Sequence, residues 1–169
     1  MSANYKDSNK PTKKSKFRQG YYKLENPDKY TGDPTKIIYR SSWEYKFCRY
    51  CDHTNEIVNW ASEPFGIKYY DPITKKERTY HIDFFIRIAK NGTMNDFLIE
   101  VKPKAKLKAP ILEAKQTLKR LKAYNTEMEE FILNKAKKEA AEAYAHAMGY
   151  KYMIITEDFL FDNKKDGKS

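Results

Sequence analysis

The sequence predicts an α/β domain in which a mixed β-sheet forms the core and helices flank it. Two apolar runs at residues 80–88 and 97–102 lie on either side of an Asn-Gly turn and predict neighbouring strands. A helical stretch separates the second run from a third at residues 150–156, which indicates a mixed sheet with helices packed on it. With 169 residues, 40% of them hydrophobic and 33% charged, the chain suffices for one domain with a buried core.

The two ends of the chain are predicted to lie outside this domain. Residues 1–36 are polar and basic and contain three prolines, so we expect an N-terminal arm that is ordered only in part. Residues 37–162 form the predicted domain. Residues 163–169 (NKKDGKS) read as a disordered tail.

The first predicted elements are a helix and two short strands. Ser41 and Ser42 begin a helix over WEYKFCRYCDHT, which has apolar side chains at helical spacing. Strands follow at residues 57–60 and 65–70. A turn at Asp71-Pro72 and a charged loop over residues 75–78 (KKER) come next.

The second half contributes the strongest strands and two predicted helices. Residues 80–88 (YHIDFFIRI) and 97–102 (FLIEVK) are strands, and the second is apolar enough for a central, buried place. Pro110 is predicted as the first residue of a helix that runs to residue 123. Thr126 and Glu129 form a capping-box pattern for another helix, which ends at Gly149.

The charge balance indicates a polyanionic partner. The chain has 33 Lys and Arg residues against 23 Asp and Glu, a net charge of +10, which is typical of nucleic-acid binding. Six basic residues and one acid lie in residues 6–18, and eight basic residues and one acid in residues 102–122. This clustering favours a role in binding a partner, usually nucleic acid, over a charge that only keeps the chain soluble. The partner that we expect is double-stranded DNA. The predicted DNA-binding residues are Lys104, Lys106, Lys108, Gln116, Lys119 and His81.

Two of these DNA contacts have simpler alternatives. Gln116 is explained equally by an exposed helix surface, and His81 by sharing a strand face with Asp83. No apolar run is long enough to span a bilayer and no signal peptide is present, so we expect no membrane partner. Cys48 and Cys51 with His53 resemble half of a zinc site, but no second cysteine pair exists, which favours a place in the helix core.

One constellation of charged residues points to chemistry. Asp83 lies in the middle of an apolar strand, where an unpaired carboxylate is costly without a partner or a metal. Glu100 and Lys102 are two residues apart on the next strand and therefore share one face. Two carboxylates and a backbone carbonyl such as that of Val101 suit Mg²⁺, which prefers oxygen ligands. A lysine beside them can orient a water and offset negative charge.

This constellation has a structural alternative. Glu100 and Lys102 alone are explained by an ion pair at a strand end, and Asp83 by a backbone turn. The order of apolar strand with Asp, turn, and apolar strand ending in Glu-x-Lys before a basic segment favours a functional site. The motif alone leaves Glu44 undecided between the site and a helix capping box with Ser41.

At these residues the sequence resembles the PD-(D/E)xK nuclease superfamily, which has the restriction-endonuclease-like fold. The resemblance lies in residues 40–52 (RSSWEYKFCRYCD), 78–86 (RTYHIDFFI) and 97–104 (FLIEVKPK). Residues 149–160 (GYKYMIITEDFL) are similar to the TnsA-like members. Residues 17–44 resemble the head-completion nucleases of T-even-type phages, and that similarity continues to about residue 160. The proline usual before the motif Asp is Ile82 here.

The resemblance implies a catalytic set of Glu44, Asp83, Glu100 and Lys102 and a Mg²⁺ cofactor that Mn²⁺ can replace. It implies a DNA endonuclease of phage head completion that processes the packaged DNA end before tail attachment. Portal or neck proteins are then expected partners, and the expected location is the host cytoplasm during virion assembly, or the virion. The alternatives are a non-catalytic DNA-binding head–neck assembly protein and a TnsA-like or repair nuclease of a mobile element. The intact Asp, Glu and Lys favour an enzyme, and the long N-terminal arm favours phage assembly.

Overall fold

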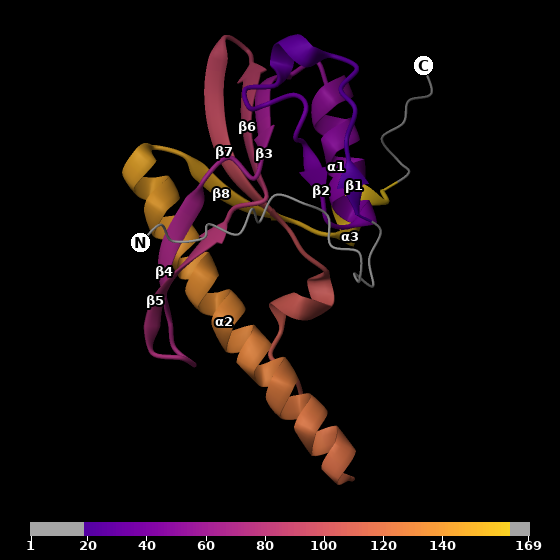
Figure 1. The fold of residues 1–169 in the computed structure, drawn as a ribbon, viewed down its shortest axis with the longest axis vertical. Coiled ribbons are helices and arrows are strands. Elements are labelled where there is room, and N and C mark those ends of the chain that lie inside the picture. Colours follow the sequence, from indigo (N-terminus) through magenta and orange to yellow (C-terminus); the bar gives the residue numbers. More distant parts are fainter. Residues whose placement is uncertain (1–18, 163–169) are drawn as a thin grey trace, which may run out of the picture.

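A four-stranded mixed sheet forms the centre of the computed structural model, which describes residues 19–162 (Figure 1). The strand order is β3-β6-β7-β8, with β3–β6 and β6–β7 antiparallel and β7–β8 parallel. The predicted mixed α/β sheet is therefore confirmed, with residues 97–101 in a central strand. The strands are β3 (Ile57–Ser62), β6 (Phe84–Lys90), β7 (Thr93–Val101) and β8 (Lys151–Ile155).

The connections explain this strand order. Asn91 and Gly92 both have positive φ values, 52° and 75°, as a two-residue hairpin turn between antiparallel strands requires. After β7 the chain crosses the sheet through the long helix α2 (Leu118–Met148) and returns as β8. A parallel neighbour needs such a crossover, because a tight turn can only reverse the chain.

Buried side chains lie on both faces of the sheet. On one face, α1 (Ser42–His53), the ribbon of β1 (Gly20–Tyr21) and β2 (Ile38–Tyr39), and α3 (Glu157–Leu160) cover a cluster around Trp60 and Phe47. On the other face, α2 and the hairpin of β4 (Gly66–Asp71) and β5 (Lys76–His81) cover a second cluster around Leu98 and Ala141. Cys48 and Cys51 are fully buried in the first cluster, as predicted for helix core.

The prediction of one strand over residues 80–88 is wrong. β5 ends at His81 and pairs with β4, whereas β6 begins at Phe84 and pairs with β3 and β7. Asp83 lies in the break, where its carbonyl accepts the Glu63 backbone N–H at 2.8 Å and its carboxylate accepts another. These contacts turn the chain from one sheet to the other.

The predicted charged loop over residues 75–78 is also wrong, because Lys76–His81 is strand β5. Its charges point outward from a two-stranded hairpin and pair across it. Glu77 lies 3.0 Å from Lys68, and Arg78 lies 2.9 Å from the Asp71 carboxylate. Opposite charges on facing strands favour pairing despite the low hydrophobicity.

The helices predicted from Pro110 and from Thr126 are corrected to one continuous helix, α2. Residues 108–117 form no helix, and the Thr117 side chain caps α2 by accepting the Arg120 N–H at 3.2 Å. Thr126 instead lies inside the helix and donates to the Lys122 carbonyl four residues earlier. No Gly or Pro interrupts residues 118–148, so nothing divides the helix. Its end at Gly149, with φ 72°, is as predicted.

A short 3₁₀ helix, η2 (Lys104–Leu107), connects β7 to the segment before α2. The first half of α2 extends away from the sheet, and its second half packs on β4 and β8 (Figure 1). None of the helices in residues 19–162 is long and apolar enough to cross a membrane.

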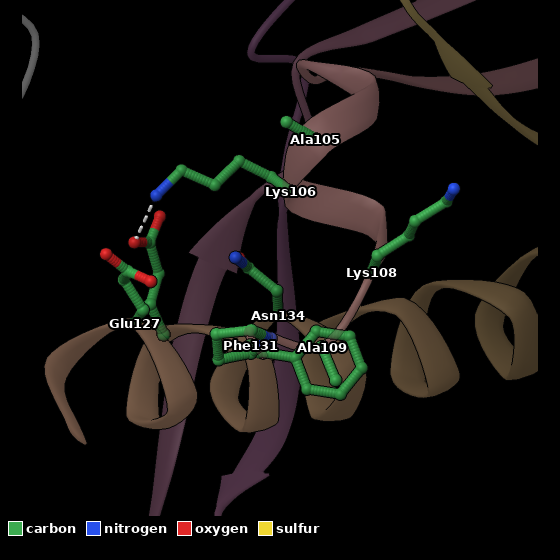
Figure 2. Close-up of a pocket in the computed structure, with 9 residues that line it drawn as sticks. Ala105, Lys106, Lys108, Ala109, Glu127, Phe131 and Asn134 are labelled. Atoms are coloured by element: carbon green, nitrogen blue, oxygen red, sulfur yellow. Dashed lines mark hydrogen bonds and ion pairs between the residues drawn. The ribbon is translucent and has the colours of Figure 1, made fainter. Parts of the chain in front are cut away.

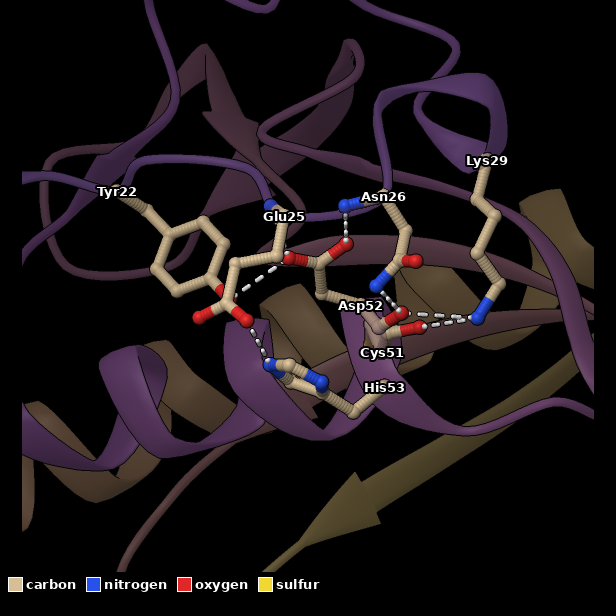
Figure 3. Close-up of polar contacts among 7 residues, drawn as sticks. All are labelled: Tyr22, Glu25, Asn26, Lys29, Cys51, Asp52 and His53. Carbon is tan, nitrogen blue, oxygen red and sulfur yellow. Dashed lines mark hydrogen bonds and ion pairs between the residues drawn. The ribbon is translucent and has the colours of Figure 1, made fainter.

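Residues 19–36, the described part of the predicted arm, pack on α1 (Figure 3). The buried Asp52 carboxylate accepts the Tyr22 hydroxyl at 2.9 Å and the Glu25 and Asn26 backbone N–H groups at 2.8 and 3.0 Å. Lys29, in the 3₁₀ helix η1 (Pro27–Lys29), donates to carbonyls at the end of α1. The basic cluster at residues 6–18 and the predicted tail at residues 163–169 lie outside the described residues.

Candidate active site

The predicted site residues come from three segments that meet where β6, β7 and α1 adjoin. Asp83 lies directly before β6, Glu100 lies near the end of β7 and Lys102 follows it, and Glu44 is in the first turn of α1. The Asp83 carboxylate accepts the Val101 backbone N–H at 2.7 Å. Val101 is the residue between Glu100 and Lys102. The bond therefore fixes Asp83 beside the end of β7.

Lys102 is held by two acceptors. Its ammonium lies 3.1 Å from Glu100 Oε1 and donates to Asn134 Oδ1 on α2 at 3.2 Å. The side chains of Lys102 and Glu100 are only 16% and 14% exposed, so the pair is shielded from bulk solvent. Glu100 and Lys102 thus share one face, as their spacing predicts, and α2 contributes a residue that the motif does not contain.

The electrostatics of the site favour a cation. Burial, followed by the negative charges of Glu100 and Glu44, raises the pKa of Asp83 well above its usual range. The Val101 N–H and the Lys102 charge oppose this rise only in part. Glu100 Oε2 is buried and has no hydrogen-bond partner among the described residues. Carboxylates that repel one another, one with an unused buried oxygen, fit the donor set of a hard divalent ion.

The side chains alone do not complete a metal shell. Among residues 19–162, no three His, Cys, Asp or Glu side chains lie close enough together to hold a metal ion. Two carboxylates leave positions for a backbone carbonyl, water and a substrate oxygen, as is usual for Mg²⁺, which keeps several waters. The residues present therefore fit Mg²⁺ better than an ion that needs a full protein cage.

Glu44 has a capping role and also faces the site. Its backbone N–H donates to Ser41 Oγ at 3.1 Å, and its carboxylate accepts the Ser41 hydroxyl at 3.2 Å and the Arg40 N–H at 2.7 Å. Burial raises the pKa of Glu44. Its negative charge also contributes to the raised pKa of Asp83. Capping and proximity to the other carboxylates are therefore compatible.

Arg40 and Glu63 belong to the same cluster, and the sequence assigned neither to the site. Arg40 Nε and one of its terminal nitrogens lie 2.5 and 3.1 Å from the two Glu63 oxygens. Glu63 adopts a φ of 44°, unusual for a residue with a side chain, and its N–H donates to the Asp83 carbonyl. The pair thereby connects the segments of Glu44 and Asp83. The one signal in the sequence was that Glu63 precedes Pro64 near the start of a predicted strand, to which no role was assigned.

The predicted DNA-binding residues differ in their ion pairs and in their distance from the carboxylates of the site. Lys104 and Lys106 each lie 2.6 Å from a carboxylate, Asp158 and Glu130 respectively, and follow β7 closely. Lys108 makes no ion pair with any described residue, and His81 is exposed at the end of β5. Gln116, just before α2, and Lys119, in its first turn, are both exposed. Lys119 lies 15 residues, or about 22 Å, along the helix from Asn134. The structure does not bring these last two to the carboxylates.

A groove runs beside Lys102, between the segment 102–110 and α2. It contains two cavities of about 290 Å³ each, which share Lys106, Phe131 and Asn134. Figure 2 shows the first, with Lys106 reaching from η2 and Phe131 lying on α2. The Lys106 ammonium donates to the Glu130 carboxylate at 2.6 Å. The second is lined by Lys102 itself and by two further lysines of α2.

A mixed sheet that positions Asp83 beside a strand ending in Glu-x-Lys, with helices on both faces, is the architecture of the restriction-endonuclease-like nucleases. The family model described as TnsA-like endonuclease N terminal matches residues 54–157, a range that includes Asp83, Glu100 and Lys102. The chain therefore belongs to the TnsA-like endonucleases of the PD-(D/E)xK superfamily. It is 36% identical over 141 residues to the head completion nuclease of Enterobacteria phage T4. The aligned part covers 83% of this chain and 92% of that protein. Nucleases of this class generally use divalent metal ions.

Proposed function

We propose that this chain is a Mg²⁺-dependent DNA endonuclease that hydrolyses phosphodiester bonds during the completion of a phage head. The relative from phage T4 bears the name head completion nuclease, and the similarity extends over almost all of that relative. In this setting the enzyme processes the DNA end left by packaging before the tail is attached.

The observation that carries the proposal is the arrangement of Asp83 and Glu100. Their carboxylates are close enough to raise the pKa of Asp83, and Glu100 Oε2 is buried without a partner among the described residues. Such a pair is costly, and the charge of Lys102 offsets the cost only in part. We assign Asp83, Glu100 and the Val101 carbonyl as ligands of Mg²⁺, with Mn²⁺ as a substitute. The bound ion would activate a water and offset charge on the phosphate.

Lys102 has a defined role in this scheme. Glu100 and Asn134 hold its ammonium in place, so it needs little reorganisation to donate to the attacking water or to a phosphate oxygen. Glu44 acts as the fourth catalytic residue. Its contacts with the Arg40 N–H and the Ser41 hydroxyl fix its carboxylate in the first turn of α1.

DNA approaches through the basic residues that follow β7. Lys104, Lys106 and Lys108 contact the backbone, and Lys104 and Lys106 exchange their present carboxylate partners for phosphates. Gln116, Lys119 and His81 are proposed as more distant contacts with the same duplex. Removing one lysine that binds a phosphate should reduce the salt dependence of binding, by about 0.9 in the logarithmic slope for duplex DNA.

Nicking of supercoiled plasmid tests the enzyme directly. The wild-type protein should cut with Mg²⁺ or Mn²⁺ and not with EDTA, and Glu100→Ala and Lys102→Ala should abolish cutting. Glu77→Ala and Lys76→Ala, the same residue types on the exposed hairpin, serve as matched controls and should cut normally. A wild-type protein that binds DNA but does not cut with any divalent metal would instead support the non-catalytic head–neck assembly role.

A further inference from the structure

The cavity beside Lys102 differs from the rest of the basic surface. Four lysines line it, and among residues 19–162 no carboxylate does. Its remaining wall is largely apolar and consists of Leu107, Phe131, Tyr152 and Ile154, with Asn134 as the single uncharged polar residue. Lysines beside aromatic and aliphatic side chains are the composition that binds a nucleotide through both its backbone and its base.

The cavity is continuous with the candidate active site. In the β7–β8 register, Leu98 pairs with Tyr152 and Glu100 with Ile154, so the two β8 residues lie on the same face of the sheet as Glu100. The charge of Glu100 contributes to the raised pKa of Tyr152, after burial. Asn134 contacts Lys102 and also lines the cavity. A ligand in this cavity therefore lies next to Lys102 and to the group that the Lys102 ammonium binds.

Phe131 is available for such a ligand. It belongs to neither buried cluster, and its ring stacks on no other aromatic ring among the described residues. Lys135, one turn further along α2, lines the cavity and makes no ion pair with residues 19–162. Lys106 and Lys138 pair with Glu130 and Glu142, but both ion pairs are about half exposed. A phosphate can therefore replace either glutamate as the partner of its lysine at little cost.

The size of the cavity restricts the ligand. About 290 Å³ is at the lower end of the range for ligand pockets, about 300–1,000 Å³. Bases inside a duplex are stacked and paired and cannot enter a pocket unless they leave the helix. The neighbouring cavity of the groove is lined in part by Glu127 and Glu130. Their negative charges repel phosphates, so the backbone of an incoming strand favours the cavity lined by lysines, next to Lys102.

We propose that this cavity, formed by Phe131, Tyr152, Lys106, Lys135 and Lys138, binds one unpaired nucleotide next to the phosphate that is cut. The inference rests on the proposed DNA endonuclease function and specifies its substrate as a duplex with a single-stranded extension. The base packs against Phe131 and the cavity wall, and the lysines hold the adjoining phosphate. The cavity thus selects DNA ends and branches over continuous duplex.

Binding measured in EDTA tests this proposal without any cleavage. The probes are a blunt DNA hairpin and the same hairpin with a short 3′ or 5′ single-stranded extension, whose first unpaired base is 2-aminopurine. The wild-type protein should bind one extended hairpin at least about fivefold more tightly than the blunt one, because stacking of one base contributes about 5- to 150-fold. Its 2-aminopurine fluorescence should also change on binding. Equal affinity for all three hairpins would overturn the proposal.

Variants assign the effect to the cavity. Phe131→Ala should lose the preference for the extension and keep its affinity for the blunt hairpin within about twofold, which also reports an intact fold. Phe131→Tyr should retain the preference. Ile132→Ala, the next residue on α2 and outside this cavity, is the matched control. A preference that survives in Phe131→Ala would refute the assignment.

The charge of the cavity is tested separately. Lys135→Ala should lower the salt slope for the extended hairpin by about 0.7, the value for one phosphate of a single strand. Lys76→Ala, on the exposed hairpin, should leave it unchanged. The binding assay requires no cleavage, so the two proposals can fail separately. A protein that cuts plasmid but binds blunt and extended hairpins equally refutes the cavity proposal alone. An end preference without cutting refutes the proposed nuclease function alone.

Discussion

The metal-free protein should become more stable when Asp83 is replaced by Asn. Burial of the Asp83 carboxylate and the negative charges of Glu100 and Glu44 raise its pKa. In the Asp83→Asn variant an amide oxygen can still accept the Val101 N–H, now at 2.7 Å, while the negative charge is absent. Replacing unfavourably buried charges stabilises by about 1–4 kcal/mol. Because Lys102 offsets part of the repulsion, we expect about 2 kcal/mol, or 4–8 °C in Tm for a chain of about this length.

The sign of the pH dependence follows from the same shift. Because the folded protein holds the Asp83 proton more tightly than the unfolded chain, stability falls as pH rises above the ordinary pKa of Asp. The fall stops once pH passes the raised pKa of the folded state. The advantage of Asp83→Asn should therefore be small in acid and grow towards neutral pH.

Thermal unfolding at several pH values, in EDTA and in Mg²⁺, measures both effects. Mg²⁺ at ten times its Kd should stabilise the wild type by about 1.4 kcal/mol and should have little effect on Asp83→Asn. Asp96→Asn is the matched control. It lies on β7, the strand whose Val101 N–H binds Asp83, and its carboxylate is 2.7 Å from Arg87. The variant should therefore gain no stability and should keep the response to Mg²⁺. An Asp83→Asn protein less stable than wild type in EDTA at neutral pH would refute the reasoning.

Three further substitutions test other contacts. Asp52→Asn should lower the free energy of unfolding by about 1.5–3 kcal/mol in urea titrations, because an amide nitrogen would face donors that now bind a charged carboxylate. Glu63→Gln should lower it by about 1–2 kcal/mol in the same assay, because it breaks the two-point contact with Arg40. Asn134→Ala should reduce single-turnover cleavage about tenfold at saturating protein, because Lys102 loses one of its two acceptors.

Each of these has an outcome that contradicts it. The exposed pair of Glu77 with Lys68 provides the reference for Glu63, since Glu77→Gln should change stability by about 0.5 kcal/mol or less. Equal effects at the two glutamates would mean that the Arg40 contact is no stronger than a surface ion pair. For Asp52, stability within about 0.5 kcal/mol of wild type would be the contrary result. For Asn134, unchanged cleavage would show that Glu100 alone positions Lys102.

The sequence predicted the central part of the sheet because local signals and tertiary structure agree there. Asn91-Gly92 adopts the turn that its residue types favour, and the apolar residues of 97–101 occupy a strand covered on both faces. The end of α2 at Gly149 and the start of α1 at Ser41 also follow from single residues with strong capping preferences.

Other features depend on contacts that no local pattern contains. The break at Asp83 exists because Glu63 and Val101, distant in sequence, bind its carbonyl and carboxylate. The capping pattern at Thr126 was overridden because the helix had already begun at Thr117 and nothing stopped it. Arg40 and Asn134 were missed at the site for the same reason. Each reaches it from another element, through a partner far away in the chain.

The parallel pairing of β7 with β8 has a consequence for synthesis of the protein. Glu100 is in β7, but its neighbour Ile154 is in β8, and the Lys102 N–H donates to the Ile155 carbonyl. Ordering of the strand end that carries Glu100 and Lys102 must therefore wait until the later residues up to Ile155 have left the ribosome. A nascent or truncated chain has the motif but not its setting.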